Sequence, residues 1–519
     1  MKLLNHFFRL MRINYILMRY NIDDVVLGTH RFFLLRYLVY LNPFYWTATR
    51  KLPRGERVRL AIEALGPIFV KAGQILSTRR DILPDDIANA LAKLQDRVTP
   101  FSGKRAKRMI KTALNLPLRE VFTHFDKNAL ASASIAQVHA ATLITGESVV
   151  VKVLRPNIHQ RIAADLDLLY LLASLANRTL KGAVHFKPKA LVDEIAETLT
   201  NELDLLREGA NASQLKRNFA KDASLSVPHI HWEFSRTNVL TMERMHGIPI
   251  HHVAALKNAG FDLKKIAESL INVFFTQVFR DNFFHADLHP GNLFVHEKQM
   301  HQPALIAVDF GIVGSLSQRD QRYIAENMMA FFNRDYQRVA ELHIASGWLP
   351  PDTRVDQFEG AIRAVSEPIF AQPFADISFG HLLMRLFQVA ERYQINIQPQ
   401  LILLQKTLLG MEGLCRELAP HLNLWEAATP QIEKWLKQQV GVKAFFQRVR
   451  ANLPRWSEQL PELPSLVYDV LMQNKAAALS KHYAPAPRPR SKLTPYLAFG
   501  GGVMVASIVF ILFNVLGAF

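Results

Sequence analysis

The chain has 519 residues, more than one hydrophobic core usually supports, so we expect two or three structural units. Hydrophobic residues make up 49% of it, which excludes general disorder, and the single cysteine, Cys415, excludes an intrachain disulfide or a multi-cysteine zinc site. Lys and Arg number 62 against 45 Asp and Glu, and the resulting charge of +17 indicates an anionic partner or surface.

The first 60 residues are basic, and their Lys and Arg residues are interleaved with Phe, Tyr, Leu and Ile. This mixture suits an anionic membrane surface, and a merely solvated basic face is the alternative. We find no zinc-finger spacing, aromatic RNA-binding signature or long basic run, so no nucleic-acid partner is expected.

Hydrophobic periodicity predicts the elements that follow. Amphipathic helices are predicted over 56–115, and the period changes near 120 to predict strands at 130–143 and 148–156 joined by a turn. Helical patterns come next, including 190–219, and a strand at 237–245 precedes a helix at 262–282. A hairpin over 293–311 and a mostly helical remainder to about 480 complete this part of the chain.

The C-terminal end predicts a membrane anchor. Residues 497–519 contain no charged residue, and a helix of this length, at about 1.5 Å per residue, would span a hydrocarbon core of roughly 30 Å. Arg488, Arg490 and Lys492 lie just before it and predict, by the positive-inside rule, that the rest of the chain is cytoplasmic. A buried amphitropic tail is the alternative.

A group of polar residues in the second half of the chain predicts phosphotransfer chemistry. Asp287 is followed five positions later by Asn292, and Asp309 opens an Asp-Phe-Gly tripeptide after an apolar strand. This order matches the catalytic-loop Asp, the metal-binding Asn and the DFG Asp of kinases. Because Mg²⁺ prefers hard oxygen ligands, Asn292 and Asp309 are predicted metal ligands, and Asp287 is predicted to orient a hydroxyl or a water.

Lys152 is the one charged residue of an apolar strand, where a charge is costly unless it is paired. It is predicted to bind the α and β phosphates of a nucleotide. Its ion-pair partner should come from the helix that follows, where Glu202, Asp204 and Glu208 are the candidates. A solvated helix face is the alternative for these acids.

The hairpin before Lys152 contains no Gly-rich loop. Its predicted nucleotide-binding residues are Ala129, Leu130, Ala131, Ser132, Ala133, Ser134, Ile135, Ala136 and Gln137. Because alanine lacks the backbone freedom of glycine, nucleotide handling should differ from that of protein kinases.

Together with two further motifs, these residues resemble the UbiB family, the atypical kinase-like proteins tied to ubiquinone biosynthesis. Lys71-Ala72-Gly73-Gln74 matches the family's KxGQ signature, and residues 131–134 match its Ala-rich replacement for the Gly-rich loop. Glu202-Leu203-Asp204 matches its ExD motif. The similarity runs from about residue 55 to 430.

The resemblance implies roles for these residues. It makes Glu208 the partner of Lys152, and it makes Glu202 and Asp204 face a regulatory helix that carries Lys71 and Gln74 and excludes protein substrates from the site. It also implies ATP or ADP with Mg²⁺ as cofactors, a bacterial inner-membrane location, and membrane lipids, ubiquinone precursors and other ubiquinone-biosynthesis proteins as partners.

The expected fold is α+β, a protein-kinase-like two-lobed fold with an N-terminal helical extension and a C-terminal transmembrane helix. The expected domains are the extension (1–118), the N-lobe (119–247), the C-lobe with a helical region (248–480), a Pro/Arg linker (481–496) and the transmembrane helix (497–519). The expected function is that of an ATP-dependent atypical kinase or ATPase that supports ubiquinone biosynthesis through the handling of membrane lipid intermediates. A small-molecule phosphotransferase and a nucleotide-binding lipid scaffold without essential catalysis are the alternatives.

Overall fold

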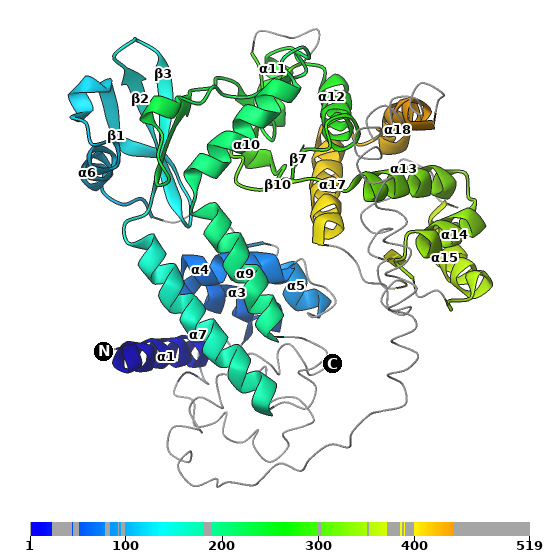
Figure 1. Cartoon of the computed structure of the whole chain (residues 1–519), viewed down its shortest axis with the longest axis horizontal. Coiled ribbons are helices and arrows are strands. Elements are labelled where there is room, and N and C mark those ends of the chain that lie inside the picture. The colour runs from blue at the N-terminus through cyan, green and yellow to red at the C-terminus, as the bar shows by residue number, and fades with distance from the viewer. Residues whose placement is uncertain are drawn as a thin grey trace, which may run out of the picture.

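The computed structural model describes most of the chain up to residue 440. The described residues are 2–22, 44, 51–77, 84–91, 93–94, 99–179, 188–297, 303–349, 352–370, 385–386, 389 and 399–440. Figure 1 shows them as a sheet-containing lobe, a mainly helical lobe beside it, and a group of helices below the first lobe.

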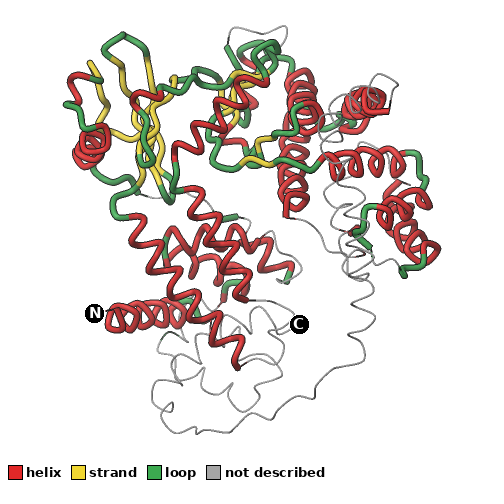
Figure 2. The backbone as a smooth tube through the Cα atoms, in the orientation of Figure 1, coloured by secondary structure: helices red, strands yellow, loops and turns green. Residues whose placement is uncertain are grey.

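An antiparallel sheet of four strands, in the order β1-β2-β3-β5, forms the centre of the N-lobe (Figure 2). Its strands are β1 (Phe122–Ser132), β2 (Ala136–Leu143), β3 (Ser148–Leu154) and β5 (Val239–Glu243). The predicted hairpin before Lys152 is confirmed, and Gly146 occupies its turn with a φ of 90°, which favours glycine.

Strand β1 was not predicted as a separate element. Residues 130–143 were taken as one strand, but the chain reverses between Ser132 and Ala136, where the N–H of Ala133 donates to the carbonyl of Ala136 at 2.9 Å. The pairing of β1 with β2 has several register shifts, and burial along β1 does not alternate. The period-2 signal on which strand prediction depends is therefore lost.

The two faces of the sheet have different neighbours. Val151 and the other odd-numbered valines of β3 pack in one cluster with Ile110 and Leu114 of helix α6 (Gly103–Leu114). Because side chains alternate along a strand, Lys152 points to the opposite face. Helix α10 (Leu205–Asn218) covers that face, so the candidate site and α6 lie on opposite sides of the sheet.

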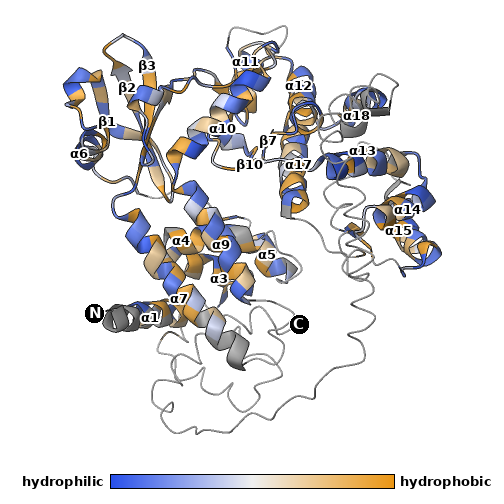
Figure 3. Cartoon of the chain, in the orientation of Figure 1, coloured by the Kyte–Doolittle hydropathy of each residue, from blue (hydrophilic) through white to orange (hydrophobic). Residues whose placement is uncertain are grey.

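The N-terminal helices form a bundle with the two helices that connect β3 to α10. They are α1 (Lys2–Arg19), α3 (Arg54–Leu65), α4 (Pro67–Ser77) and α5 (Asp85–Leu91), and the connecting helices are α7 (Ile158–Thr179) and α9 (Pro188–Glu202). Hydrophobic and hydrophilic stretches alternate along these helices in Figure 3, as expected when one side of each is buried. Residues of α1, α3, α4 and α5 share a core with Leu168 of α7.

The predicted helical run 190–219 is two helices. Helix α9 ends at Glu202 and α10 begins at Leu205, with Asp204 between them. The Asp204 carboxylate accepts a hydrogen bond from the N–H of Leu206 at 3.0 Å and thereby caps α10. Aspartate is favoured at an N-cap position because its short side chain accepts a hydrogen bond from a free backbone N–H of the first turn.

The C-lobe is mainly helical around short strands. Its strands are β4 (Leu225–Ser226), β6 (Ile248–Pro249), β7 (Phe284–His285), β8 (Leu293–Val295), β9 (Leu305–Ala307) and β10 (Val313–Gly314). Its helices are α11 (Val253–Asn258), α12 (Leu263–Phe275), α13 (Gln318–Phe332), α14 (Tyr336–Ala345), α15 (Val355–Phe370), α17 (Pro399–Leu418) and α18 (Leu424–Val440). Strands β8 and β9 pair antiparallel, which confirms the predicted hairpin, and the predicted helix 262–282 is α12 followed by a π-helical turn to Arg280.

The prediction of a transmembrane helix is corrected. Among the described residues, no helix combines the length and the apolar character that crossing a membrane requires. The longest of them, α7 with 22 residues and α17 with 20, carry charged residues such as Asp165 and Lys406. Residues 497–519, on which the anchor was predicted, lie outside the described residues. We therefore withdraw the transmembrane helix from the fold class, and with it the single-pass inner-membrane location.

Candidate active site

Lys152 lies between two carboxylates. Its Nζ is 2.7 Å from Glu208 Oε1 and 3.2 Å from Asp309 Oδ2. Strand β3 supplies the lysine, α10 supplies Glu208, and the loop after β9 supplies Asp309, so the N-lobe and the C-lobe meet at this ammonium group. The implied pairing of Lys152 with Glu208 is therefore present, across 56 residues of sequence.

The charges of this cluster shift its titration. Burial alone would lower the pKa of Lys152, but the Asp309 and Glu208 carboxylates outweigh it and raise that pKa, so the ammonium stays charged. Burial raises the pKa of Glu208 to about 7, against the attraction of Lys152. Desolvation opposes ionisation of Asp309 as well, yet the Lys152 ammonium and the N–H of Gly311 lower its pKa to about 2. The Asp309 carboxylate is thus ionised at neutral pH.

Asp309 has an unusual backbone conformation. Its φ is 65°, a left-handed value that is uncommon for residues other than glycine but tolerated by aspartate. The next residue is fixed from α10, because the Asn211 side-chain amide donates to the carbonyl oxygen of Phe310 at 2.9 Å. The ring of Phe310 is buried, whereas the Asp309 side chain is 49% exposed. The carboxylate is therefore held in place but accessible.

The loop around Asp287 follows β7 and is ordered by local hydrogen bonds. His285 Nδ1 accepts from the N–H of Asp287 at 3.1 Å, and His289 Nδ1 accepts from the N–H of Gly291 at 3.0 Å. The Asn292 side-chain nitrogen donates to the carbonyl oxygen of Asp287 at 3.3 Å. Both histidines thus order the loop, and the hydrogen bond of the Asn292 amide links Asn292 to Asp287.

Asn292 and Asp309 could bind a Mg²⁺ ion together with the phosphates of a nucleotide. The hydrogen bond from the Asn292 nitrogen leaves its carbonyl oxygen as a ligand, and Asp309 offers an ionised carboxylate. Within the described ranges, no cluster of three or more His, Cys, Asp or Glu side chains could hold a metal ion. Mg²⁺ needs no such cluster, because it is commonly bound through one or two protein oxygens together with substrate phosphates and water.

A lysine that the sequence did not single out contacts Asp287. Lys406 of α17 places its Nζ 3.3 Å from Asp287 Oδ1, and His289 Nε2 lies 3.9 Å from Asp287 Oδ2. Burial would raise the pKa of Asp287, but the positive charges of Lys406, His289 and Lys71 lower it. The available signal was a lone lysine in the apolar run Leu401 to Leu409, 119 residues after Asp287.

The predicted regulatory residues make three separate contacts. Lys71 Nζ lies 2.7 Å from Glu202 Oε1, and both side chains are about seven-eighths buried, so α4 of the extension is joined to the end of α9. Gln74 instead donates its side-chain amide to the carbonyl of Leu94, 3.1 Å away. Asp204 caps α10 as described above. Of the two acidic residues in the ExD motif, Glu202 makes the ion pair with the extension.

The Ala-rich loop is a tight turn at the edge of the sheet. None of its residues 129–137 has a positive φ, so glycine is not needed for this conformation. The exposed side of the turn carries Leu130 and Ala131, whereas the side chains of Ser134, Ile135, Ala136 and Gln137 are buried. Gln137 exchanges hydrogen bonds with the backbone of Phe101 at 2.9 and 3.1 Å, which makes its side chain part of the lobe's packing.

Arg155, another residue that the sequence reasoning missed, fixes this turn. Its guanidinium donates to the carbonyl oxygen of Ala133 at 2.9 Å and to the hydroxyl of Ser132 at 2.8 Å. Its own N–H donates to the carbonyl of Ile135 at 2.7 Å. An arginine three residues after Lys152 thus supplies the rigidity of the turn.

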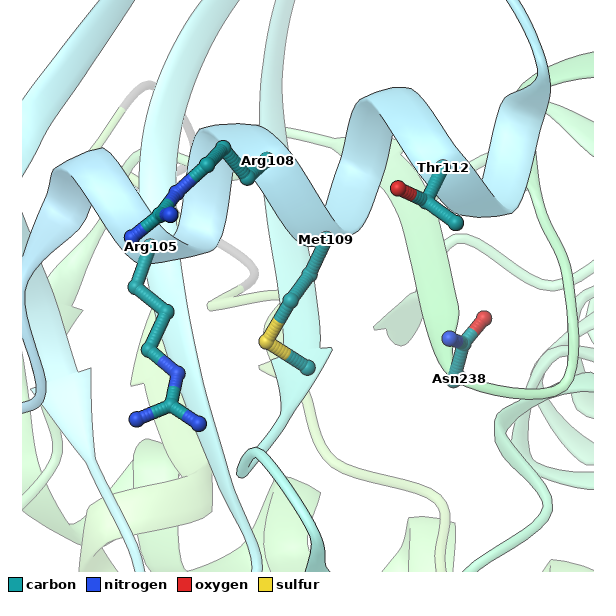
Figure 4. A pocket seen from close by; sticks show the side chains of 5 residues that line it. All are labelled: Arg105, Arg108, Met109, Thr112 and Asn238. Carbon is teal, nitrogen blue, oxygen red and sulfur yellow. The ribbon is translucent and has the colours of Figure 1, made fainter.

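A pocket of about 420 Å³ lies elsewhere on the N-lobe (Figure 4). Its lining residues are Arg105, Arg108, Met109 and Thr112 of α6, together with Asn238. Helix α6 covers the face of the sheet opposite Lys152, and none of the predicted site residues lines this pocket. It is therefore separate from the candidate active site.

Comparison with known proteins agrees with the fold and the motifs. Residues 93–343 match the ABC1 atypical kinase-like domain, and residues 362–423 match the UbiB helical domain. "Probable protein kinase UbiB" of Marinobacter nauticus is 51% identical over 469 residues, which cover 90% of this chain and 86% of the relative. The protein of the same name from Pseudomonas paraeruginosa is 49% identical over 500 residues, which cover 96% of this chain and 92% of the relative.

A solved structure, the complex of Rv3197 with erythromycin from Mycobacterium tuberculosis, has the same fold. It aligns with a TM-score of 0.50 and 21% identity over 69% of this chain and 90% of that chain. The sequence resemblance is thus confirmed by two family models and by relatives of about 50% identity along nearly their whole length. The chain belongs to the UbiB family of atypical kinase-like proteins.

Proposed function

We propose that this protein is a Mg²⁺-dependent ATPase or atypical kinase that supports ubiquinone biosynthesis. The observation that carries the proposal is the position of Lys152 Nζ, 2.7 Å from Glu208 and 3.2 Å from Asp309. A buried lysine joined to a helix glutamate and to the DFG aspartate is the arrangement that binds nucleotide phosphates in kinases. The name UbiB, which the curated relatives carry, supports the link to ubiquinone.

Each residue has a role in this proposal. Lys152 binds the α and β phosphates, and the turn of residues 129–137 covers them. Asn292 and Asp309 hold Mg²⁺, which when bound offsets the negative charge of the phosphates. Asp287, whose lowered pKa keeps its carboxylate ionised, orients the attacking hydroxyl or water and takes up its proton as the phosphoryl group is transferred.

The acceptor in this proposal is water or a small molecule and not a protein. Helix α4 supports this choice, because Lys71 is paired with Glu202 at 2.7 Å and its charge also lowers the pKa of Asp287. A helix that the Lys71–Glu202 ion pair holds on this side of the site favours a small acceptor over a protein. The partners we propose are membrane lipids, polyprenylated ubiquinone precursors and other ubiquinone-biosynthesis proteins, and the basic residues of helix α1, whose apolar face packs in the bundle, support an anionic lipid surface.

ATP turnover and quinone production test the proposal together. The full-length protein should hydrolyse or transfer phosphate from ATP, and Asp287→Asn should lower this turnover by about 10²- to 10⁴-fold, the usual effect of removing a general base. Lys152→Ala should weaken ATP binding strongly in calorimetry, because it removes the cation buried beside the phosphates.

The same variants are then expressed in a strain that lacks the gene, and quinones and their intermediates are profiled. Asp287→Asn should fail to restore quinone production. Restoration by this variant, in a strain where gene loss abolishes quinone, would instead identify a scaffold whose catalysis is dispensable. Lys437→Met is the matched control, because Lys437 lies on the exposed surface of α18 and, among the described residues, pairs with its helix neighbour Glu433 at 3.1 Å.

A further inference from the structure

Three lysines from three elements lie near the predicted reacting groups. Lys152 pairs with Glu208 and Asp309, Lys71 pairs with Glu202, and Lys406 pairs with Asp287. The first two are nearly buried, with side-chain exposures of 13% and 12%, whereas Lys406 is 45% exposed. Lys406 is therefore the lysine whose own side chain has the most freedom to move toward a bound nucleotide.

The loop that carries Asp287 contains no Lys or Arg of its own. Between His285 and Asn292 the sequence is Ala-Asp-Leu-His-Pro-Gly, so His289 is the loop's own cation when protonated. A phosphoryl group in transfer spreads negative charge over its equatorial oxygens, and catalysis depends on cations placed to stabilise it. Such a cation at Asp287 comes here from a different element, helix α17.

Helix α17 contacts the backbone of this loop at two points. The Thr407 hydroxyl donates to the carbonyl oxygen of Ala286 at 3.0 Å. A Cβ atom at Gly410 would lie 3.5 Å from the carbonyl oxygen of Leu288, so the helix touches the loop one turn beyond Lys406. Positions 406 and 410 share one helix face, since they are four residues apart. The packing of α17 therefore sets where the Lys406 ammonium lies.

We propose that Lys406 is a further catalytic residue. When ATP binds, the Lys406 ammonium group moves away from the Asp287 carboxylate and contacts the terminal phosphate. This inference rests on the proposed function. In the reaction, the bond between the terminal phosphorus and the oxygen bridging to ADP breaks, and a bond to the oxygen of water or a hydroxyl acceptor forms. The acceptor proton passes to Asp287, ADP leaves with the bonding electron pair, and Lys406 compensates the charge on the transferred group.

The test compares Lys406→Met, Lys406→Arg and the control Lys437→Met in the full-length protein. Lys406→Met should lower the kcat of ATP turnover by about 10²-fold, as loss of one stabilising group does. It should also lower the affinity for a non-hydrolysable ATP analogue by about tenfold. The affinity for ADP should stay within about twofold of the wild type, because only a triphosphate reaches Lys406. Lys406→Arg should restore part of both, and Lys437→Met should match the wild type.

The affinity ratio separates a catalytic role from a structural one. Loss of Lys406 should weaken binding of the ATP analogue relative to binding of ADP, and arginine should restore part of this difference. A helix anchor without a catalytic role would leave the ratio of ATP-analogue to ADP affinity unchanged.

The outcomes separate the two proposals. If the wild type turns over ATP and Lys406→Met behaves like Lys437→Met, the role of Lys406 is wrong and the proposed function stands. Equal weakening of ADP and of the ATP analogue, with a lower melting temperature, also overturns it in favour of a structural role. If the wild type shows no turnover, the proposed function fails, and the affinity ratio of the ATP analogue to ADP alone decides whether Lys406 contacts the terminal phosphate.

Discussion

The ion pair between Lys71 and Glu202 should join the N-terminal extension to the kinase-like lobe energetically. At the observed Nζ to Oε1 distance of 2.7 Å, Coulomb's law gives a gross attraction of roughly 6 kcal/mol with an effective dielectric constant of about 20. Desolvation of the two ions offsets part of it, since their side chains are only 12% and 13% exposed. A coupling of about 3 kcal/mol or slightly more between the two side chains remains.

Single and double substitutions should differ in a characteristic way. Lys71→Met or Glu202→Leu alone leaves one buried charge without this partner and should lower the local opening free energy of α4 and α9 by about 3 kcal/mol. The double variant replaces both charges by apolar side chains and should lose less than either single one. This inequality follows because an unpaired buried ion costs more than an apolar pair of similar volume.

Amide hydrogen exchange measures these openings locally, which matters because a chain of several units does not unfold in one two-state step. A loss of 3 kcal/mol accelerates exchange in α4 and α9 by roughly 150-fold, while α18 should keep the exchange rates of the wild type. If the two single effects add up to the double effect within about 0.5 kcal/mol, the side chains are not coupled and the reasoning is refuted.

Three other substitutions test separate features. Asp204→Ala removes the N-cap of α10 and should cost about 1 kcal/mol, measured as faster exchange in the first turn of that helix. Gly73→Ala places a Cβ 2.6 Å from Leu94 Cδ1 and should lower the local opening free energy of α4, measured by amide exchange, by about 1 to 3 kcal/mol, whereas Gly360→Ala, with no atom within 4 Å, should not lower that of α15. Burial lowers the pKa of His343 from 6.5 to about 4, so the unfolded chain binds this proton first as the pH falls. Stability should therefore be full above pH 6.5 and fall by about 3 kcal/mol down to pH 4, and His343→Leu should remove this dependence.

The sequence predicted the chemistry of the site better than its surroundings. Lys152 and Asp309 could be predicted because each is a charged residue within or directly after an apolar strand, whereas Glu208 was one of three candidate acids and was selected by the family resemblance. The helix break at Asp204 could have been predicted as well, since an aspartate two residues before Leu206 is a typical N-cap. Hydrophobic periodicity alone predicted one continuous helix, because the apolar spacing continues across the break.

Other features depend on tertiary packing that no local pattern encodes. Lys406 approaches Asp287 only because α17 packs on the catalytic loop, and a lone lysine in an apolar run does not indicate which residue it contacts 119 residues away. Strand β1 was missed because its irregular pairing with β2 breaks the alternation. The membrane span was inferred from the hydropathy of 497–519, and no helix of the described residues has that property.

The break between α9 and α10 lies between the contact to the N-terminal extension and the contact to the predicted phosphate site. Glu202 binds the extension and Glu208 binds the phosphate-site lysine, and only the capped turn at Asp204 separates them along the chain. Any ligand of the extension that favours one orientation of α10 changes the affinity for nucleotide by some factor. Thermodynamic reciprocity then requires nucleotide to change the affinity for that ligand by the same factor. The coupling free energy can therefore be measured by titrating nucleotide with and without saturating ligand of the extension, or by titrating that ligand with and without saturating nucleotide.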